Sequence, residues 1–267
     1  MDELEQLVAS VVSSRKYGQV CAEVIRNVGA RELAARRSLK DAVKATKNKL
    51  HQVGAAYLDA GIDYSRWERQ LWVAADSSDP AQLRRACAEW MHGHSSTRER
   101  LPILEAFYAE TLQGLPPLRT VLDLACGLNP LALPWMGLPQ GVRYYAYDMY
   151  VDMAEFLNRF FVWVGMQGEA VACDVACAPP TRRADLALLL KTLPCLEQLD
   201  RSASARLLDG LKADYLLVSF PVRSLGGRDK RMTENYEAHF LELVAGKPWE
   251  VRRFVFSTEL AFLVHKR

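Results

Sequence analysis

Three aspartates, each at the end of a short apolar run, could together bind a cationic nucleoside. Asp123 lies in the run 120–124, Asp148 ends the run 144–148, and Asp174 follows the run 169–173. A carboxylate about 20 residues beyond a glycine-containing turn is the position that binds ribose hydroxyls in Rossmann-like sites. A further carboxylate beside free backbone groups could read the amino group of adenine.

The turn after the first run is Ala125-Cys-Gly127-Leu-Asn-Pro130, and its single glycine lets a ligand approach the backbone closely. The pattern G-x-G-x-x-G, which binds a dinucleotide pyrophosphate, is absent. S-adenosylmethionine (SAM) carries an amino group, a sulfonium charge and no phosphate, so it fits three carboxylates better. The alternative is that these aspartates only cap helices. Their register with Cys126-Gly127 favours the cofactor.

Two other kinds of chemistry find little support. Pro194-Cys195 could supply a nucleophile for methylation of cytosine C5. However, Cys195 lies in a leucine-rich stretch, so we interpret it as a buried thiol. The six cysteines form no Cys-x-x-Cys pair and no histidine-rich segment accompanies them, so we expect reduced thiols and no metal site.

The elements that must position these residues differ between the two parts of the chain. Residues 1–115 have apolar residues at three- and four-residue spacing, which predicts a helical N-terminal domain. We expect this domain to dock on RNA because of the basic residues that it carries. Gly114-Leu-Pro-Pro-Leu118 marks a boundary. Residues 116–267 alternate short apolar runs with amphipathic segments, which predicts βαβ units and a parallel sheet.

We expect seven strands in the second part, separated by helices such as 150–165 and 197–210. The predicted strands are 120–125, 143–148, 169–173, 184–190, 214–220, 251–256 and 259–265. Only Ser257-Thr258 separates the last two, which predicts an antiparallel hairpin. This layout is typical of α/β class I SAM-dependent methyltransferases, with a Rossmann-like seven-stranded sheet and here an all-helical N-terminal domain.

Composition sets only broad limits. The chain has 267 residues, of which half are hydrophobic, and a net charge of +2. The acidic start, Met1-Asp-Glu-Leu-Glu5, is unlike a signal peptide, and no apolar run approaches the ~20 residues that span a bilayer. We therefore expect a cytoplasmic protein, a monomer, with no membrane contact.

Four motifs resemble one family of enzymes. They are 121–130 (VLDLACGLNP), 94–101 (HSSTRERL), 190–198 (LKTLPCLEQ) and 219–228 (SFPVRSLGGR). The chain resembles the aminoglycoside-resistance 16S ribosomal RNA guanine-N7 methyltransferases over its whole length. This resemblance implies methylation of a guanine N7 in the decoding site of the 30S subunit, with resistance to drugs of the gentamicin and kanamycin type.

The resemblance also implies roles for individual residues. The cofactor contacts that it implies are Thr97 and Arg98 at the SAM carboxylate, His94 and Ser96 nearby, Ala125 and Gly127 at the methionine end, Asp148 at the ribose, and Asp174 with Val175 at the adenine. Arg98 could bind a carboxylate bidentately. The alternative interpretation is that Arg98 only forms an exposed helical pair within Arg98-Glu-Arg100.

The expected chemistry needs no general base. Guanine N7 already carries an in-plane lone pair, so catalysis would rest on positioning and desolvation. Lys191, at the end of the fourth strand, could donate to guanine O6. Its alternative is a solvated lysine. By resemblance, Arg228 and Met232 also help to position the target.

Basic residues predict an RNA-binding surface. Residues 31–50 hold seven Arg or Lys against two acidic residues. Arg36, Arg37, Lys40, Lys44 and Lys47 are expected to share a helical face. The second basic group is Arg223, Arg228, Lys230 and Arg231, with Arg15 and Lys16 as further contacts. Such charges can also be merely solvated.

Two other functions stay open at this point. A small-molecule SAM methyltransferase would explain the second part of the chain but not the basic residues. A non-catalytic protein that binds RNA or the ribosome would explain the basic residues but not the glycine turn with Asp148.

Overall fold

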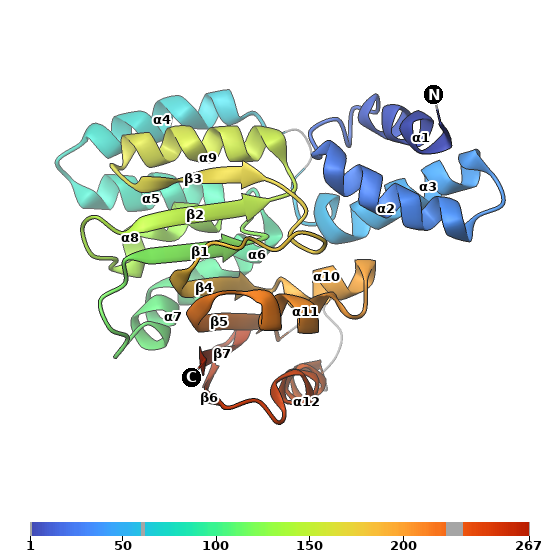
Figure 1. Cartoon of the computed structure of the whole chain (residues 1–267). Helices are drawn as coiled ribbons and strands as arrows, with labels where there is room; N and C mark the ends of the chain where they lie inside the picture. Colours follow the sequence, from blue (N-terminus) through green and yellow to red (C-terminus); the bar gives the residue numbers. More distant parts are fainter. Residues whose placement is uncertain (1, 60–61, 223–231, 267) are drawn as a thin grey trace.

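A seven-stranded sheet organises the chain in the computed structural model, which describes residues 2–59, 62–222 and 232–266 (Figure 1). The strands are β1 (Thr120–Leu124), β2 (Arg143–Asp148), β3 (Gln167–Ala172), β4 (Ala184–Leu190), β5 (Ala213–Pro221), β6 (Trp249–Val255) and β7 (Glu259–Lys266). Their spatial order is β3-β2-β1-β4-β5-β7-β6. The first five are parallel, whereas β7 runs antiparallel to β5 and β6. The seven predicted strands and the terminal hairpin are confirmed.

The strand sequences divide their side chains between the two faces of the sheet. Leu122 and Leu124 of β1 pack into one core, while Val121 packs into the core on the opposite face. Both faces of β4 are buried as well, as parallel sheets require. The sheet is therefore the middle layer of three.

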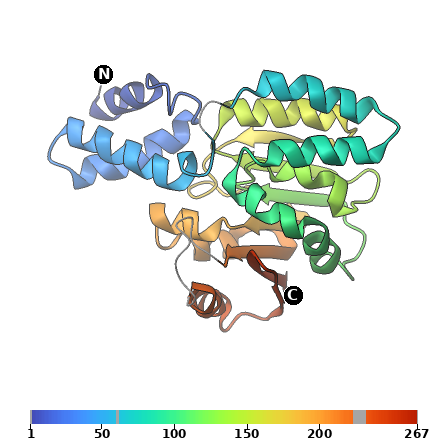
Figure 2. The ribbon, with the colours of Figure 1, turned by 180° about the vertical axis from the view of Figure 1, so that it is seen from behind.

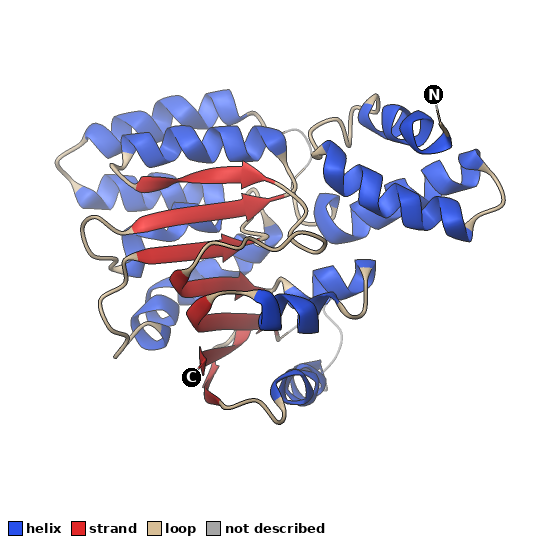
Figure 3. Cartoon of the chain, viewed as in Figure 1, coloured by secondary structure: helices blue, strands red, loops and turns tan. Residues whose placement is uncertain are grey.

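Helices cover both faces of this sheet (Figure 3). One face carries α4 (Tyr64–Asp76), α5 (Pro80–Met91), α7 (Leu104–Thr111) and α9 (Val151–Trp163), with short turns of helix at α6 (Ser95–Arg100), η2 (Leu101–Ile103), η3 (Asn129–Ala132) and α8 (Leu133–Met136). The view from behind shows this layer in front of the strands (Figure 2). The other face carries α10 (Leu193–Leu199), α11 (Ala203–Gly210) and α12 (Met232–Val244).

Three N-terminal helices lie beyond the carboxyl ends of the strands (Figure 1). They are α1 (Glu3–Val12), α2 (Ala22–Ala35) and α3 (Leu39–Leu50), and α3 continues into a π-helical turn, η1 (His51–Ala55). The predicted helical character of residues 1–115 is confirmed. However, α4 packs on α9, so only α1–α3 stand apart from the layers of the sheet. The division of the chain at residue 115 stays a prediction.

One predicted helix is wrong. The segment 197–210 is interrupted, because α10 ends at Leu199 and Asp200 takes an extended conformation. The Asp200 carboxylate accepts hydrogen bonds from the backbone and the hydroxyl of Ser202, at 2.9 and 2.8 Å. This Asp-x-Ser turn competes with helix continuation, and the apolar periodicity that runs through it does not reveal it.

Gly168 offers a test of this sheet. Its φ is +134°, and a Cβ there would lie 1.9 Å from the carbonyl oxygen of Tyr144 on the paired strand β2. Gly165 also has a positive φ, of +66°, but no atom lies within 4 Å of its Cβ position. Gly165→Ala should cost about 1–2 kcal/mol of unfolding free energy. Gly168→Ala should cost at least twice as much, because β2 and β3 must separate. Chemical denaturation measures both, and equal losses would contradict this packing.

Candidate active site

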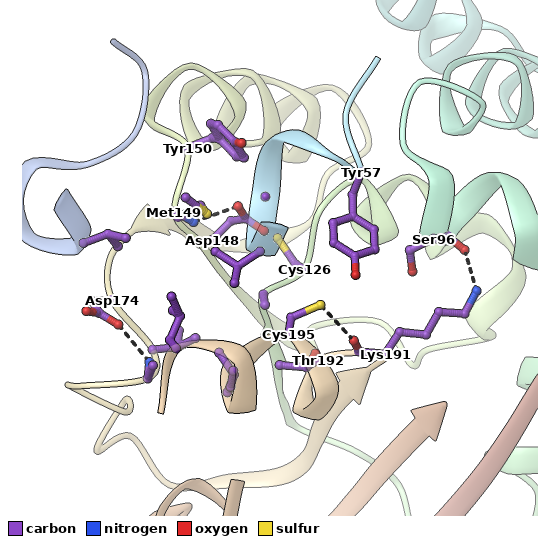
Figure 4. Close-up of a pocket in the computed structure, with 18 of the residues that line it drawn as sticks. Tyr57, Ser96, Cys126, Asp148, Met149, Tyr150, Asp174, Lys191, Thr192 and Cys195 are labelled. Atoms are coloured by element: carbon purple, nitrogen blue, oxygen red, sulfur yellow. Dashed lines mark hydrogen bonds between the residues drawn. The ribbon is translucent and has the colours of Figure 1, made fainter. Parts of the chain in front are cut away.

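A pocket of about 810 Å³, including its mouth, opens at the carboxyl edge of the sheet. Its volume falls in the range of ligand sites, about 300–1,000 Å³. We call it the first pocket (Figure 4). The ends of β1, β2, β3 and β4 form its floor, and α2 and η1 form its roof. Residues from these elements that line it include Val24, Gly54, Ala125, Asp148, Asp174 and Lys191.

Asp148 is tied to the turn after β1. Its carboxylate accepts hydrogen bonds from the backbone N–H of Gly127 at 2.8 Å and of Met149 at 2.7 Å. Burial raises the pKa of Asp148, although these N–H donors oppose the rise. Gly127 has a φ of +50°, and a Cβ there would come within 2.8 Å of the His94 ring. A glycine is therefore required at this turn for two reasons.

Asp174 is held by a residue that sequence reasoning missed. One carboxylate oxygen accepts from the side-chain amide of Asn27 on α2, at 2.9 Å. The other accepts from the backbone N–H groups of Ala176 and Cys177, at 3.0 and 3.1 Å. Asp174 is 4% exposed and lines the first pocket beside Val175. The N-terminal helices thus help to build the pocket.

Two strand ends that line the first pocket carry unusual backbone. Ala125 after β1 and Lys191 after β4 have φ values of +49° and +60°, a region that non-glycine residues seldom occupy. The hydroxyl of Thr192 donates to the carbonyl of Leu124 at 2.9 Å and holds the two strand ends together. Such conformations persist where surrounding contacts enforce them, which is typical of functional sites.

The side chain of Lys191 is buried and lies among three acceptor oxygens. Its ammonium lies 2.7 Å from Glu99 Oε2, 3.3 Å from the carbonyl of Ser96 and 3.4 Å from Glu259 Oε1. The first two contacts are hydrogen bonds, and the third is an ion-pair contact. The alternative of a solvated lysine is wrong. Figure 4 shows the side chain reaching toward Ser96.

A buried arginine, Arg100, connects the elements around the pocket. Its Nε lies 2.8 Å from Glu259 Oε1, and one terminal nitrogen donates to Glu259 Oε2 at 3.1 Å. The other donates to Asn129 Oδ1 at 2.9 Å, and the hydroxyl of Ser219 donates to Glu259 at 2.7 Å. Arg100 and Glu259 are both inaccessible to solvent. Four segments, namely α6, the turn after β1, β5 and β7, therefore meet at one ion pair.

Asp123, which the sequence groups with the cofactor carboxylates, belongs to this network. That grouping is wrong for Asp123, because its carboxylate points into the protein. It accepts from Asn129 at 2.9 Å and from the Tyr144 hydroxyl at 2.6 Å, and it is 1% exposed. Burial raises the pKa of Asp123 to about 6. Asp148 and Asp174 are the two strand-end carboxylates that line the pocket.

The motif 94–98 divides between the pocket and its surroundings. His94 and Ser96 line the first pocket. Thr97 is buried, and its hydroxyl donates to the carbonyl of Met91 at 2.6 Å. Arg98 donates to the carbonyl of His92 at 2.9 Å and pairs with Asp59 at 3.3 Å. The structure therefore does not bring Thr97 and Arg98 to the pocket wall.

His94 is a neutral imidazole in this setting. Burial lowers its pKa to about 3, and the positive charges of Lys191, Arg100 and Arg98 add to the shift. Its ring stacks on Tyr57 at a centroid distance of 6.2 Å. Tyr57 follows η1 and was not predicted as a site residue. A neutral His94 does not repel a cationic ligand.

A second pocket of about 630 Å³ adjoins the first and shares part of its wall. The shared residues are Tyr57, Ser96, Lys191 and Cys195. The second pocket, but not the first, is also lined by Glu99, Met232 and Tyr236. Tyr57 and Cys195 lie between Asp148 and the Ser96–Lys191 pair (Figure 4). Burial raises the pKa of the Cys195 thiol, which keeps it protonated.

The predicted basic surface is only partly described. Arg15, Lys16, Arg36, Arg37, Lys40 and Lys44 are exposed. The prediction of one helical face is wrong, because Arg36 ends α2, Arg37 lies in the connecting turn, and Ser38 caps α3. Arg36 also pairs with Glu32 at 2.9 Å. Arg223, Arg228, Lys230 and Arg231 lie outside the described residues.

No cluster of three or more His, Cys, Asp or Glu side chains could hold a metal ion within residues 2–59, 62–222 and 232–266. In those same ranges no helix is both long and apolar enough to cross a membrane.

The strand order and the pocket at the carboxyl edge define a class I SAM-dependent methyltransferase. The family model for ribosomal RNA methyltransferase (FmrO) matches residues 13–263, and the chain belongs to this family. It is 38% identical over 98% of its length to the "16S rRNA (guanine(1405)-N(7))-methyltransferase" of Frankia casuarinae, of which it covers 94%. It is 35% identical to the protein of that name from Micromonospora rosea, with 99% of this chain and 97% of that protein covered.

Solved structures agree with this assignment. The 16S rRNA methyltransferase RmtF, crystallised with S-adenosyl-L-homocysteine, is 35% identical, with all of both chains covered and a TM-score of 0.84. The 16S rRNA methylase RmtB is 28% identical, with 99% of this chain and 98% of that chain covered and a TM-score of 0.80. The predicted family, fold class, enzyme class and SAM dependence are confirmed at the level of fold and family.

Arg100 can be tested through the charge that it balances. Without Arg100, the carboxylates of Glu259 and Glu99 share only Lys191, so one buried charge is uncompensated. Arg100→Met should lower the unfolding free energy by about 3–5 kcal/mol. Replacing both partners, Arg100→Met with Glu259→Met, restores the balance and should recover part of the loss. Urea denaturation of the three proteins provides the comparison. If the double variant were no more stable than the single one, this account of the pair would be wrong.

Asn27 can be tested through ligand affinity. Asn27→Ala removes one hydrogen bond from Asp174 and should weaken SAM binding by about 1 kcal/mol, or roughly fivefold. Asn48→Ala changes an exposed asparagine on α3 and serves as the control. Isothermal titration calorimetry with SAM gives the three dissociation constants. An unchanged affinity in Asn27→Ala would show that α2 does not support the ligand through Asp174.

Proposed function

We propose that this enzyme methylates N7 of a guanine in the decoding site of 16S rRNA within the 30S subunit. The position is that of the guanine-1405 named for its relatives. Two pockets that share one wall carry the proposal, since methyl transfer needs a cofactor and a base side by side. The first pocket would hold SAM and the second the flipped base. The modification would confer resistance to gentamicin- and kanamycin-type aminoglycosides.

Unpaired polar atoms support the placement of SAM in the first pocket. Nδ1 of His94 and the hydroxyl of Tyr150 are buried there, and neither finds a hydrogen-bond partner among the described residues. A ligand with polar groups at both ends would satisfy them. Asp148, next to Tyr150, would bind the ribose, and Asp174 with Val175 would bind the adenine. Ala125, Gly127, His94 and Ser96 would surround the methionine end.

In this reaction the protein has to position the base and the methyl donor, and no proton has to be transferred. Bound SAM supplies an electrophilic methyl group on a sulfonium. Guanine N7 attacks with a lone pair that needs no deprotonation. His94 stays neutral, with a pKa of about 3, and the Cys195 thiol stays protonated because burial raises its pKa. Neither group therefore changes its charge near neutral pH.

This predicts a kcat for methyl transfer that is flat from about pH 6.5 to pH 8.5 under single-turnover conditions, because no base has to be generated. Rapid-quench measurements with labelled SAM and 30S subunits provide the profile. If the logarithm of kcat changed with pH at unit slope within that range, a titrating catalytic group would be required, which would contradict the positioning mechanism.

RNA docking would use the helices beyond the sheet edge. Arg36, Arg37, Lys40 and Lys44 are exposed on α2, α3 and the turn between them, and Arg15 and Lys16 lie near a further pocket. Lysine and arginine that contact phosphates make affinity depend on salt. We also propose that Arg223, Arg228, Lys230 and Arg231 contact the RNA and that Met232 contacts the base. The cytoplasmic location and the monomeric state stay predictions.

The decisive experiment compares methyl acceptors. Labelled methyl should pass to purified 30S subunits, and far less to free 16S RNA or nucleosides, because the docking surface is built for the folded particle. Transfer to nucleosides at the same rate would instead identify a small-molecule methyltransferase. Calorimetry with SAM addresses a non-catalytic binding protein, which would give no heat. Cells that express the enzyme should resist gentamicin and kanamycin but remain sensitive to apramycin.

A further inference from the structure

Glu99 is a carboxylate that the positioning mechanism does not use, and it lines the second pocket. It lies on α6, and its side chain is 34% exposed. Within the part of the chain that the structure describes, its carboxylate forms an ion pair with Lys191, at 2.7 Å. Lys191 itself lines both pockets, whereas Glu99 lines the second pocket and not the first.

The order of these two side chains matches the edge of a guanine. A base whose N7 faces the first pocket has O6 next to N7, and N1–H and the 2-amino group follow farther from it. Lys191, at the boundary of the pockets, is a donor and faces the position of O6. Glu99, which lines the second pocket but not the first, is an acceptor and would face N1–H and the 2-amino group.

Lys191 can release Glu99 without losing its counter-charge. Glu259 Oε1 lies 3.4 Å from the same ammonium, on the side away from solvent. The two cations Arg100 and Lys191 face the two carboxylates Glu99 and Glu259, so the cluster is neutral in total. Guanine has no net charge, and its entry exchanges hydrogen bonds without changing this balance.

We propose that Glu99 and Lys191 together read the Watson–Crick edge of the target guanine, with Glu99 as the residue that selects guanine over adenine. The inference rests on the proposed function. Adenine would present an amino group to the Lys191 ammonium and the N1 lone pair to the Glu99 carboxylate. The first contact would place a donor against a donor, and the second an acceptor against an acceptor. Leaving such polar groups unsatisfied discriminates between the two bases.

Glu99 also favours the reaction itself. In the transfer, the N7 lone pair forms the bond to the methyl carbon while the carbon–sulfur bond breaks, and its electron pair remains on sulfur. No proton moves, and the base becomes a cation. The positive charge makes N1–H a stronger donor, so its hydrogen bond to Glu99 strengthens in the transition state. Only interactions that strengthen in this way raise kcat.

The test uses Glu99→Gln, since the glutamine amide can accept from guanine and donate to adenine. Glu105→Gln, an exposed residue on α7, is the control. The substrates are 30S subunits with guanine or adenine at the modified position, assembled from tagged 16S rRNA. Single-turnover transfer at N7, 30S binding, SAM affinity and thermal unfolding are measured for each protein.

For Glu99→Gln we expect a loss of about 10- to 100-fold in kcat on guanine, as expected for one good base contact, with 30S and SAM binding within twofold of the parent protein. The ratio of guanine to adenine transfer should fall by a similar factor, and Glu105→Gln should match the parent. Equal losses on both bases, or an unchanged ratio, would overturn the role of Glu99 as a reader of the base. If the parent protein transferred no methyl to guanine 30S subunits, the proposed function itself would fail, which is a separate outcome.

Discussion

The buried ion pair between Arg100 and Glu259 is the constraint on which the site depends. Burying two charges is unfavourable unless geometry and further hydrogen bonds compensate for it. Asn129 and Ser219 provide those bonds, from the turn after β1 and from β5. Because the pair joins α6 to β7, it fixes the motif 94–100 over the sheet edge. His94, Ser96 and Glu99 reach the two pockets from this fixed motif.

The same cluster extends to the strand end that carries Lys191. Glu259 and Glu99 hold the ammonium between them, and the positive φ of Lys191 turns its chain into that position. On the other side of the first pocket, Asn27 ties α2 to Asp174. The N-terminal helices and the sheet therefore form one pocket, so the proposed RNA docking on α1–α3 and ligand binding would share structural elements. Linkage then requires that each affects the other to the same degree.

Sequence patterns predicted the sheet well because its strands are short apolar runs bounded by Asp, Gly and Pro. They also identified Asp148 and Asp174, whose positions at strand ends follow from the topology. They misassigned Asp123, since strand position does not reveal that Asn129 and Tyr144 turn its carboxylate inward. Arg100 and Glu259 are 159 residues apart, and nothing local in either segment marks them as partners. Asn27 on α2 and Tyr57 after η1 were missed for the same reason, because tertiary packing alone brings these segments to the pocket.

The central claim is that a guanine N7 in the decoding site receives the methyl group. The most direct measurement maps the modified nucleotide in 16S rRNA from 30S subunits treated with the enzyme and SAM. Borohydride and aniline cleave RNA at N7-methylguanine, and primer extension then locates the break. The proposed function predicts one new stop, at the position named for the relatives, guanine-1405, and only when enzyme and SAM are both present. Full methyl incorporation without a cleavage stop, or with a stop elsewhere, would contradict it.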